Sequence, residues 1–153
     1  MKRIEVKLAL AVVAPLLDVI RELGDALRRE PAAPVGLDDL DPEFRAAWVD
    51  EIVAAQAEEL RILLGLFDDE FFREGIVGFD AGNAEPILRA CAALRLRLRR
   101  VPLAPLGDEL LESGEVDVEE LEEGPRKAFL CYLFLATVQE LIIQHLDESI
   151  LGD

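Results

Sequence analysis

The chain contains one histidine, His145, which is the first side chain to consider for acid–base or metal chemistry. It ends an apolar stripe on a predicted helix, and Asp147 and Glu148 follow it closely. In di-iron helical bundles, a glutamate precedes the metal-binding histidine by three residues on one helix face. Position 142 here is Ile142, so the sequence predicts no metal site and no cofactor. We interpret His145 as a hydrogen-bonded residue at the edge of the core, with a ligand or pH-sensing role as the alternative.

The two cysteines, Cys91 and Cys131, are 40 residues apart among apolar residues, without a CxxC motif or zinc-type spacing. We interpret them as buried thiols that pack as small hydrophobic side chains, with a redox pair as the alternative. A disulfide would need their Cα atoms to lie within about 7 Å of each other. Cys131 and His145 are about 21 Å apart along one predicted helix, which excludes a cysteine–histidine catalytic pair within one chain.

Other catalytic motifs are absent from the sequence. The two serines, Ser113 and Ser149, do not lie in a GxSxG turn, and neither a Walker A nor a GxGxxG motif is present. Adjacent carboxylates occur several times, as expected by chance among 32 acidic residues. The sequence therefore favours a non-enzymatic role, without excluding an enzyme.

Charge is strongly segregated along the chain. Residues 89–100 contain no acid, and the next 23 residues, 101–123, contain nine acids and no base. Either the acidic segment folds back and neutralises the arginines, or one of these faces binds a partner. In the second case the acidic segment covers the basic face until a partner competes for it. The candidate partner-binding residues are Arg89, Arg95, Arg97, Arg99 and Arg100.

Hydrophobic periodicity predicts a mainly α-helical fold, a compact bundle of about four main helices. Residues 3–8 alternate apolar and polar side chains, which predicts a short β element near the N-terminus, paired with 75–79 or 115–118. The expected helices span residues 10–29, 42–67, 83–100 and a last helix that begins at Gly124–Pro125. Loops are expected at 30–40 and 68–82, and an acidic loop, with one short helical turn near 117–121, at 101–123.

Three local patterns add detail to these helices. Asp41–Pro42 is typical of a helix N-cap followed by proline at the first helical position. Gln56 interrupts an apolar stripe, which indicates an amide satisfied by the backbone of a neighbouring helix. Residues 94–99 also alternate with period two, so a strand is an alternative to the helix there.

Length and composition set the outer bounds. With 153 residues, we expect one helical domain over 1–153. The apolar content of 52% excludes a disordered acidic tail, and the net charge of −16 disfavours nucleic acid as a partner. The apolar run 128–138 is shorter than the roughly 20 residues that span a bilayer, and no convincing signal-peptide cleavage site follows the N-terminal apolar run. We therefore expect a cytoplasmic protein that does not enter the membrane.

The order of these segments resembles a known family. It comprises an RIEVKL strand, a leucine-striped helix, a helix with Trp and Leu positions from Ala47–Trp48 to Leu64, an ILRACAALRLRLRR segment that includes Arg95–Leu96, a variable acidic loop, and a closing CYLFLATVQELIIQHLDE helix that includes Gln139–Glu140. This order resembles the actinobacterial oxidative-stress-regulator-like family, long catalogued as a domain of unknown function. The resemblance implies redox-dependent regulation of cysteine biosynthesis through protein partners, and no catalytic residues. The closely spaced N-terminal cysteines that would support a redox switch are absent from this chain.

These observations favour a non-enzymatic regulatory or adaptor protein that acts through protein–protein contacts. One alternative is a small-molecule or metal-binding helical bundle that uses His145 and nearby carboxylates. Another is a redox sensor that uses Cys91 and Cys131. A homodimer is compatible with the sequence, which shows no readable interface.

Overall fold

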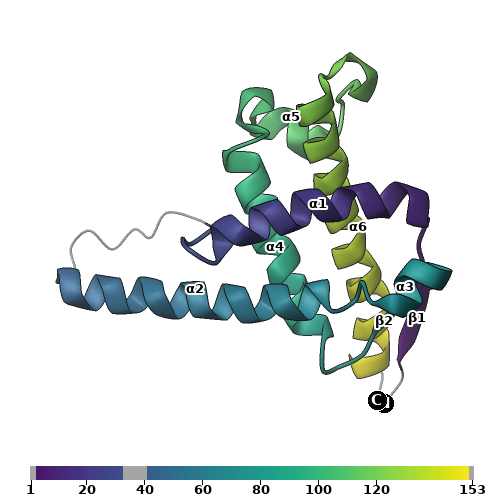
Figure 1. Cartoon of the computed structure of the whole chain (residues 1–153), viewed down its shortest axis with the longest axis horizontal. Coiled ribbons are helices and arrows are strands. Elements are labelled where there is room, and N and C mark those ends of the chain that lie inside the picture. The colour runs from purple at the N-terminus through teal and green to yellow at the C-terminus, as the bar shows by residue number, and fades with distance from the viewer. Residues whose placement is uncertain (1–2, 33–40, 152–153) are drawn as a thin grey trace.

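The computed structural model describes residues 3–32 and 41–151, with side chains described up to residue 145 (Figure 1). The described chain is mainly α-helical and contains a short antiparallel sheet, so the predicted helical class with a minor β element is confirmed. The expected loop 30–40 lies mostly outside the described residues. In chain order the elements are β1 (Ile4–Lys7), α1 (Leu10–Leu27), α2 (Pro42–Leu64), α3 (Asp69–Glu74), β2 (Ile76–Phe79), α4 (Ala84–Arg100), a 3₁₀ turn (Ala104–Leu106), α5 (Gly107–Ser113), a second 3₁₀ turn (Val118–Glu120) and α6 (Glu123–Leu151).

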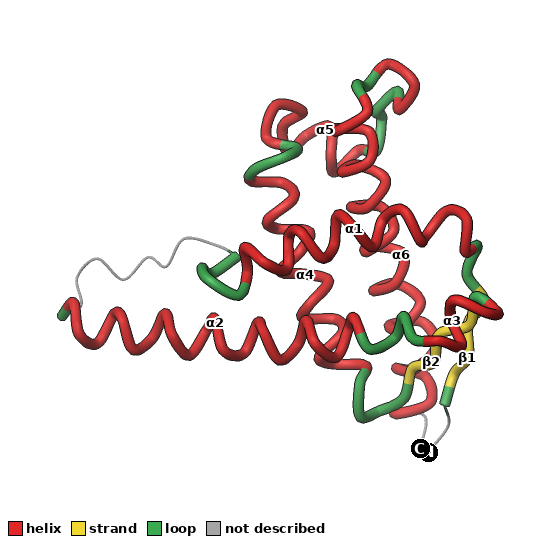
Figure 2. The backbone as a smooth tube through the Cα atoms, viewed as in Figure 1, coloured by secondary structure: helices red, strands yellow, loops and turns green. Residues whose placement is uncertain are grey.

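The sheet consists of β1 and β2, paired from Ile4 opposite Phe79 to Lys7 opposite Ile76. The predicted pairing with 75–79 is therefore confirmed, and the alternative partner 115–118 is wrong because no strand forms there. The expected loop 68–82 instead contains α3 and β2, which Figure 2 shows next to each other.

Gly75 makes the turn from α3 into the sheet. It has a φ of +74°, and its carbonyl accepts a hydrogen bond from Leu8 N at 2.7 Å. A Cβ atom on this residue would lie 2.6 Å from the Leu8 carbonyl oxygen. Glycine is therefore required here both for its left-handed conformation and for the close approach of the two backbones.

Helix α4 is the central helix, since it packs against α6, α2 and α1. Its buried stripe recurs every three or four residues, which is the spacing of one helix face. The strand alternative for 94–99 is wrong, because Leu94 and Leu98 are fully buried on this helical stripe while Leu96 is exposed. The remaining fully buried members of the stripe are Ile87 and Cys91.

The long helices do not form the expected bundle. Figure 1 shows α1 and α2 running across α4 and α6 rather than alongside them. The compact bundle of about four main helices is therefore not confirmed, although α1, α2, α4 and α6 are the long helices of the described chain.

Helix α2 packs against the other helices through its C-terminal half. Its N-terminus is capped as predicted, because the Asp41 side chain accepts a hydrogen bond from Glu43 N at 3.1 Å. The first buried residue of the helix is Gln56, and Leu60 and Leu63 behind it are fully buried. Residues 42–55 come before this point and project away from the body (Figure 1); we call them the α2 arm. At 1.5 Å per residue the arm is about 21 Å long.

Gln56 fixes the place where α2 leaves the body. Its side-chain oxygen accepts a hydrogen bond from Ala32 N at 2.8 Å. Its side-chain nitrogen donates to the carbonyl oxygens of Leu27 at 2.9 Å and Glu30 at 3.1 Å. The predicted role of this amide is therefore confirmed: it satisfies the backbone at the C-terminal end of α1.

The acidic segment 101–123 has more structure than expected. The predicted helical turn near 117–121 is a 3₁₀ turn at Val118–Glu120, and the helix α5 was not predicted. Leu103 is fully buried and Leu111 nearly so, which ties this segment to the core. The sequence pattern missed α5 because seven residues with one buried position, Leu111, do not establish a period.

Helix α6 begins where predicted but is not buried on every side. Phe129 and Leu135 face the core, whereas Leu130 and Leu133 are each 40% exposed. Among the described residues, the segment Glu123–His145 is long and apolar enough to cross a membrane by length and composition, which the shorter run 128–138 did not indicate. A core helix of a soluble protein meets the same criterion, so this is weak evidence.

Replacing Gln56 tests how the two helices are joined. We expect Gln56→Leu to lower the free energy of unfolding by about 1–3 kcal/mol, because buried backbone groups at residues 27, 30 and 32 lose their partner. Urea unfolding followed by circular dichroism measures this change. The control is Gln144→Leu, on the exposed side of α6, and equal stability of the two variants would contradict the assignment.

Candidate protein-contact surfaces

The five arginines singled out in the sequence all lie on α4, and most of them contact residues of this same chain. Arg89 lies 2.8 Å from Glu85 and 3.4 Å from Glu59. Arg97 pairs with Glu30 beyond the end of α1, and Arg100 donates to the Ala32 carbonyl oxygen. These contacts join α4 to α2 and to the segment that follows α1.

Arg99 is held by the acidic segment. Its guanidinium lies 3.1 Å from Asp108 and 3.6 Å from Glu112, both on α5. The hydrogen bond that Arg99 donates to the Asp108 carboxylate raises the pKa of Arg99 further above its ordinary value. The contacts of Arg99 therefore fit the interpretation in which the acidic segment folds back on the arginine-rich end of α4.

Arg95 has a different environment, between α4 and α6. It donates to Gln139 Oε1 at 2.7 Å and to the Tyr132 hydroxyl at 3.1 Å, and its guanidinium carbon lies 4.6 Å from the centre of the Tyr132 ring. Gln139 in turn donates to the Leu88 carbonyl at 3.1 Å. Within the described part of the chain, no carboxylate pairs with Arg95, and its buried Nε has no hydrogen-bond partner. The Arg95 side chain therefore contacts α6 and holds the two helices together.

Both cysteines are buried at the interface of the helices that pack most closely. Cys91 on α4 and Cys131 on α6 have no exposed surface, and neither is in a disulfide. Burial raises the pKa of each thiol to about 12. Because the thiolate is the reactive species, both thiols are poor nucleophiles in the folded protein. The redox-pair hypothesis stays a prediction, and it requires an oxidant to reach two thiols that have no exposed surface.

His145 is exposed near the end of the described part of α6, one turn beyond Ile142, the last buried residue described on that helix, and its role as a hydrogen-bonded residue at the edge of the core stays a prediction. Within the described residues, no group of three or more histidine, cysteine, aspartate or glutamate side chains could hold a metal ion. Nothing described around His145 supports the metal-site alternative.

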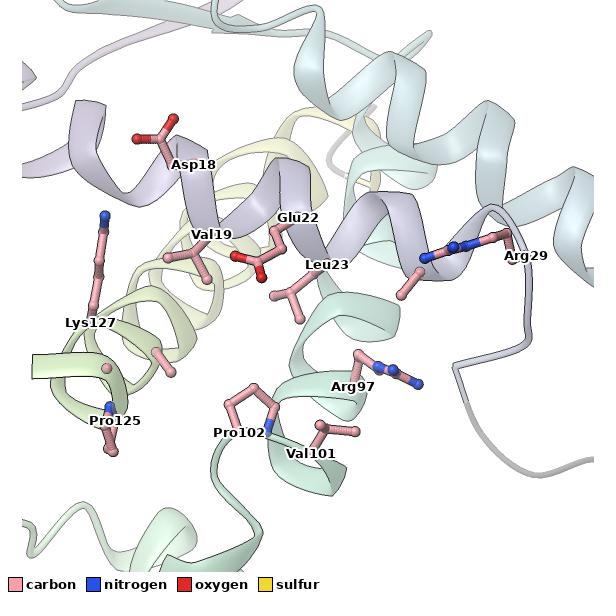
Figure 3. Close-up of a pocket in the computed structure, with 13 residues that line it drawn as sticks. Asp18, Val19, Glu22, Leu23, Arg29, Arg97, Val101, Pro102, Pro125 and Lys127 are labelled. Atoms are coloured by element: carbon pink, nitrogen blue, oxygen red, sulfur yellow. The ribbon is translucent and has the colours of Figure 1, made fainter.

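A cleft of about 620 Å³ lies between α1, the C-terminal end of α4 and the first turns of α6. Figure 3 shows Val19 and Leu23 of α1 facing Val101 and Pro102 across it. Its apolar lining also includes Ala26, Pro125 and Ala128. Five charged residues complete it: Asp18, Glu22, Arg29, Arg97 and Lys127. We call it the α1–α4–α6 cleft.

The cleft does not coincide with any chemistry predicted from the sequence. His145 lies about 26 Å farther along α6 than Ala128, at 1.5 Å per residue. Of the five candidate arginines, Arg97 alone lines the cleft. No local sequence pattern indicates the cleft, because its lining comes from three segments that only folding brings together.

The α2 arm is the second feature that the sequence analysis missed. Phe44 and Trp48 on it are 63% and 46% exposed. Val49, Ile52 and Val53 beside them are partly exposed. The four-residue spacing of Phe44 and Trp48 was a readable signal, since residues i and i+4 share a helix face.

No protein-family model, curated protein or solved structure matches this chain. The surfaces described above are therefore interpreted from their own geometry.

The raised thiol pKa values predict a dependence of stability on pH. The unfolded chain releases its thiol protons near pH 8.5, and the folded chain only near pH 12. The stability contributed by these protonated thiols is complete below about pH 8.5 and is lost as the pH rises towards 12. The free energy of unfolding should fall by up to about 1.4 kcal/mol per pH unit for each thiol in this interval.

Urea unfolding at several pH values between about 8 and 10.5 measures this slope. The double variant Cys91→Ala/Cys131→Ala should lose less stability over the same interval, because it lacks the two thiols. All other titrating groups are the same in both proteins, so the difference between the two slopes reports on the thiols. The same slope in both proteins would show that the thiols do not carry the effect.

Proposed function

We propose that this chain is a non-enzymatic cytoplasmic regulatory or adaptor module that acts through protein–protein contacts. The observation that carries the proposal is the α2 arm, a helical projection with two exposed aromatic side chains. Single exposed apolar residues are ordinary on protein surfaces. Here Phe44 and Trp48 lie one turn apart on a helix that leaves the body, next to the partly exposed Val49 and Ile52.

The composition of the arm suits an interface. Aromatic side chains are enriched at the centres of protein interfaces and supply much of the binding energy there. Burying apolar surface contributes about 25 cal/mol per Å², so burial of two exposed aromatic side chains would contribute substantially to the free energy of binding. A projecting helix with anchors at i and i+4 fits the mode in which an amphipathic helix enters an apolar groove.

The arginine-rich end of α4 is a weaker candidate for the same role. Arg89, Arg97 and Arg99 pair with carboxylates of this chain, so a partner must displace those contacts. An exposed ion pair contributes only about 0–1 kcal/mol, so such competition is feasible. The hypothesis that α5 covers Arg99 until a partner arrives therefore stays part of the proposal.

The proposal extends to membership in the oxidative-stress-regulator-like family. Arg95 and Gln139 both belong to the segments that carry this resemblance, and they share a hydrogen bond between α4 and α6. That contact supports the proposal by giving the two positions a common role in the fold.

Affinity capture from a cell lysate tests the function. The wild-type chain should retain at least one discrete protein at low and moderate salt, identified by mass spectrometry. The double variant Phe44→Ala/Trp48→Ala should lose that protein, with the dissociation constant rising about 30-fold or more, as expected when hot-spot side chains are truncated.

The matched control is Phe72→Ala, which removes an aromatic side chain that is 47% exposed on α3, outside the arm. The control should retain the partner. If the arm variant captures the same proteins as the wild type, the arm is not the contact surface and the proposal loses its support.

A further inference from the structure

The protein presents two features of matching chemistry. The α2 arm carries exposed aromatic side chains on a helix, and the α1–α4–α6 cleft has an apolar lining with charged residues around it. A cleft of about 620 Å³ is within the range of sites that enclose apolar groups. Helix-in-groove recognition needs one feature of each kind.

The arm of a chain cannot reach the cleft of the same chain. Figure 1 shows α2 on one side of α1, with the C-terminal end of α4 and the first turns of α6 on the other side, and Figure 3 shows the cleft on that second side. The C-terminal half of α2 is fixed by the hydrogen bonds of Gln56 and by the burial of Leu60 and Leu63. The arm continues this helix without interruption, so it is held pointing away from the body.

We propose that the α1–α4–α6 cleft receives the α2 arm of a second copy of this chain, and that the two copies exchange arms reciprocally. Phe44 and Trp48 of each copy enter the apolar part of the other copy's cleft, against Val19, Leu23 and Val101. The result is a closed dimer with two-fold symmetry.

Charge supports a second copy as the occupant. The arm contains Glu43, Asp50 and Glu51 against one arginine, a net charge of −2. The lining of the cleft contains three cations and two carboxylates, and because Arg97 pairs with Glu30 the cleft is close to neutral in a chain whose net charge is −16. The acidic arm therefore meets a surface that is less negative than the average of the chain.

The reciprocal arrangement also increases the surface area that the dimer interface buries. Stable protein interfaces bury about 1,200–2,000 Å² in total. One arm of about four turns offers a small contact, and two-fold symmetry provides this contact twice. A one-way contact would leave one arm and one cleft open and would propagate into a chain of molecules, whereas reciprocal exchange closes.

This inference deepens the proposed function and rests on it, since it assigns a partner to the same arm. Self-association and binding of another protein would then compete for Phe44 and Trp48. The two proposals can fail separately. Lysate capture tests binding of another protein, and the behaviour of the purified chain tests self-association.

Sedimentation equilibrium and fluorescence of the purified full chain test the dimer. Trp48 is the only tryptophan, so its emission reports on the arm alone. The chain should change from monomer to dimer as its concentration rises, at an ionic strength of about 0.15 M to screen the net charge. Over the same range the Trp48 emission should move to shorter wavelength as the indole leaves water.

Two variants identify the surfaces. Phe44→Ala/Trp48→Ala removes the anchors of the arm, and Val101→Glu places a charge in the cleft at a side chain that is 52% exposed. Each should raise the dimer dissociation constant by about 30-fold or more. The matched controls are Phe72→Ala and Val12→Glu, which alter exposed side chains outside both surfaces and should leave the constant unchanged. Circular dichroism verifies that all four variants fold.

A mixture of the two variants distinguishes arm exchange from pairing of two arms with each other. The arm variant keeps an intact cleft and has no tryptophan, and the Val101→Glu chain keeps an intact arm. Adding the first to the second should shift the Trp48 emission of the second to shorter wavelength. A wild-type chain that stays monomeric overturns the proposal, as does a Val101→Glu chain that dimerises normally or a mixture without the shift.

Discussion

The fold depends on a single helix, α4, that packs against three others. Its one apolar stripe is fully buried by α6, α2 and α1, so the same few side chains hold all the long helices in place. Truncating a buried leucine such as Leu94 or Leu98 removes contacts to several neighbours at once, and such changes typically cost about 2–5 kcal/mol. The buried thiol of Cys91 belongs to this stripe, which explains why it behaves as a packing group.

The two proposed contact surfaces arise because α4 covers only part of each neighbouring helix. Helix α2 has 23 residues, but only its C-terminal half reaches α4 and α1. Gln56 closes that contact by satisfying the backbone at the end of α1, and the residues of the α2 arm that precede it are exposed or only partly buried. The cleft arises at the other side of α1, where the ends of α4 and α6 diverge around it.

In the proposed function, the charge distribution favours recognition through apolar contacts. Most arginines of α4 are engaged with carboxylates or carbonyls of this chain, while the acidic residues far outnumber the bases. A surface of −16 charges repels other acidic surfaces beyond the screening length. Binding would therefore need exposed apolar surface and a local charge that differs from the average of the chain. The arm supplies the exposed apolar surface, and the cleft supplies the different local charge.

The sequence by itself determined the local features. Helical periodicity located α1, α2, α4 and α6, alternation located β1, and the Asp41–Pro42 pair located a helix start, because each depends only on neighbours along the chain. It also predicted a buried role for the cysteines and a backbone-binding role for Gln56.

The tertiary structure alone decided the rest. The crossing of the helix pairs, the exposure of His145 and the assembly of the cleft depend on which faces meet, and residues such as Val19, Val101 and Pro125 are too far apart in sequence for any local pattern to join them. The partners of the arginines were decided in the same way, since Arg97 meets Glu30 and Arg95 meets Gln139 only after α1 and α6 have packed against α4.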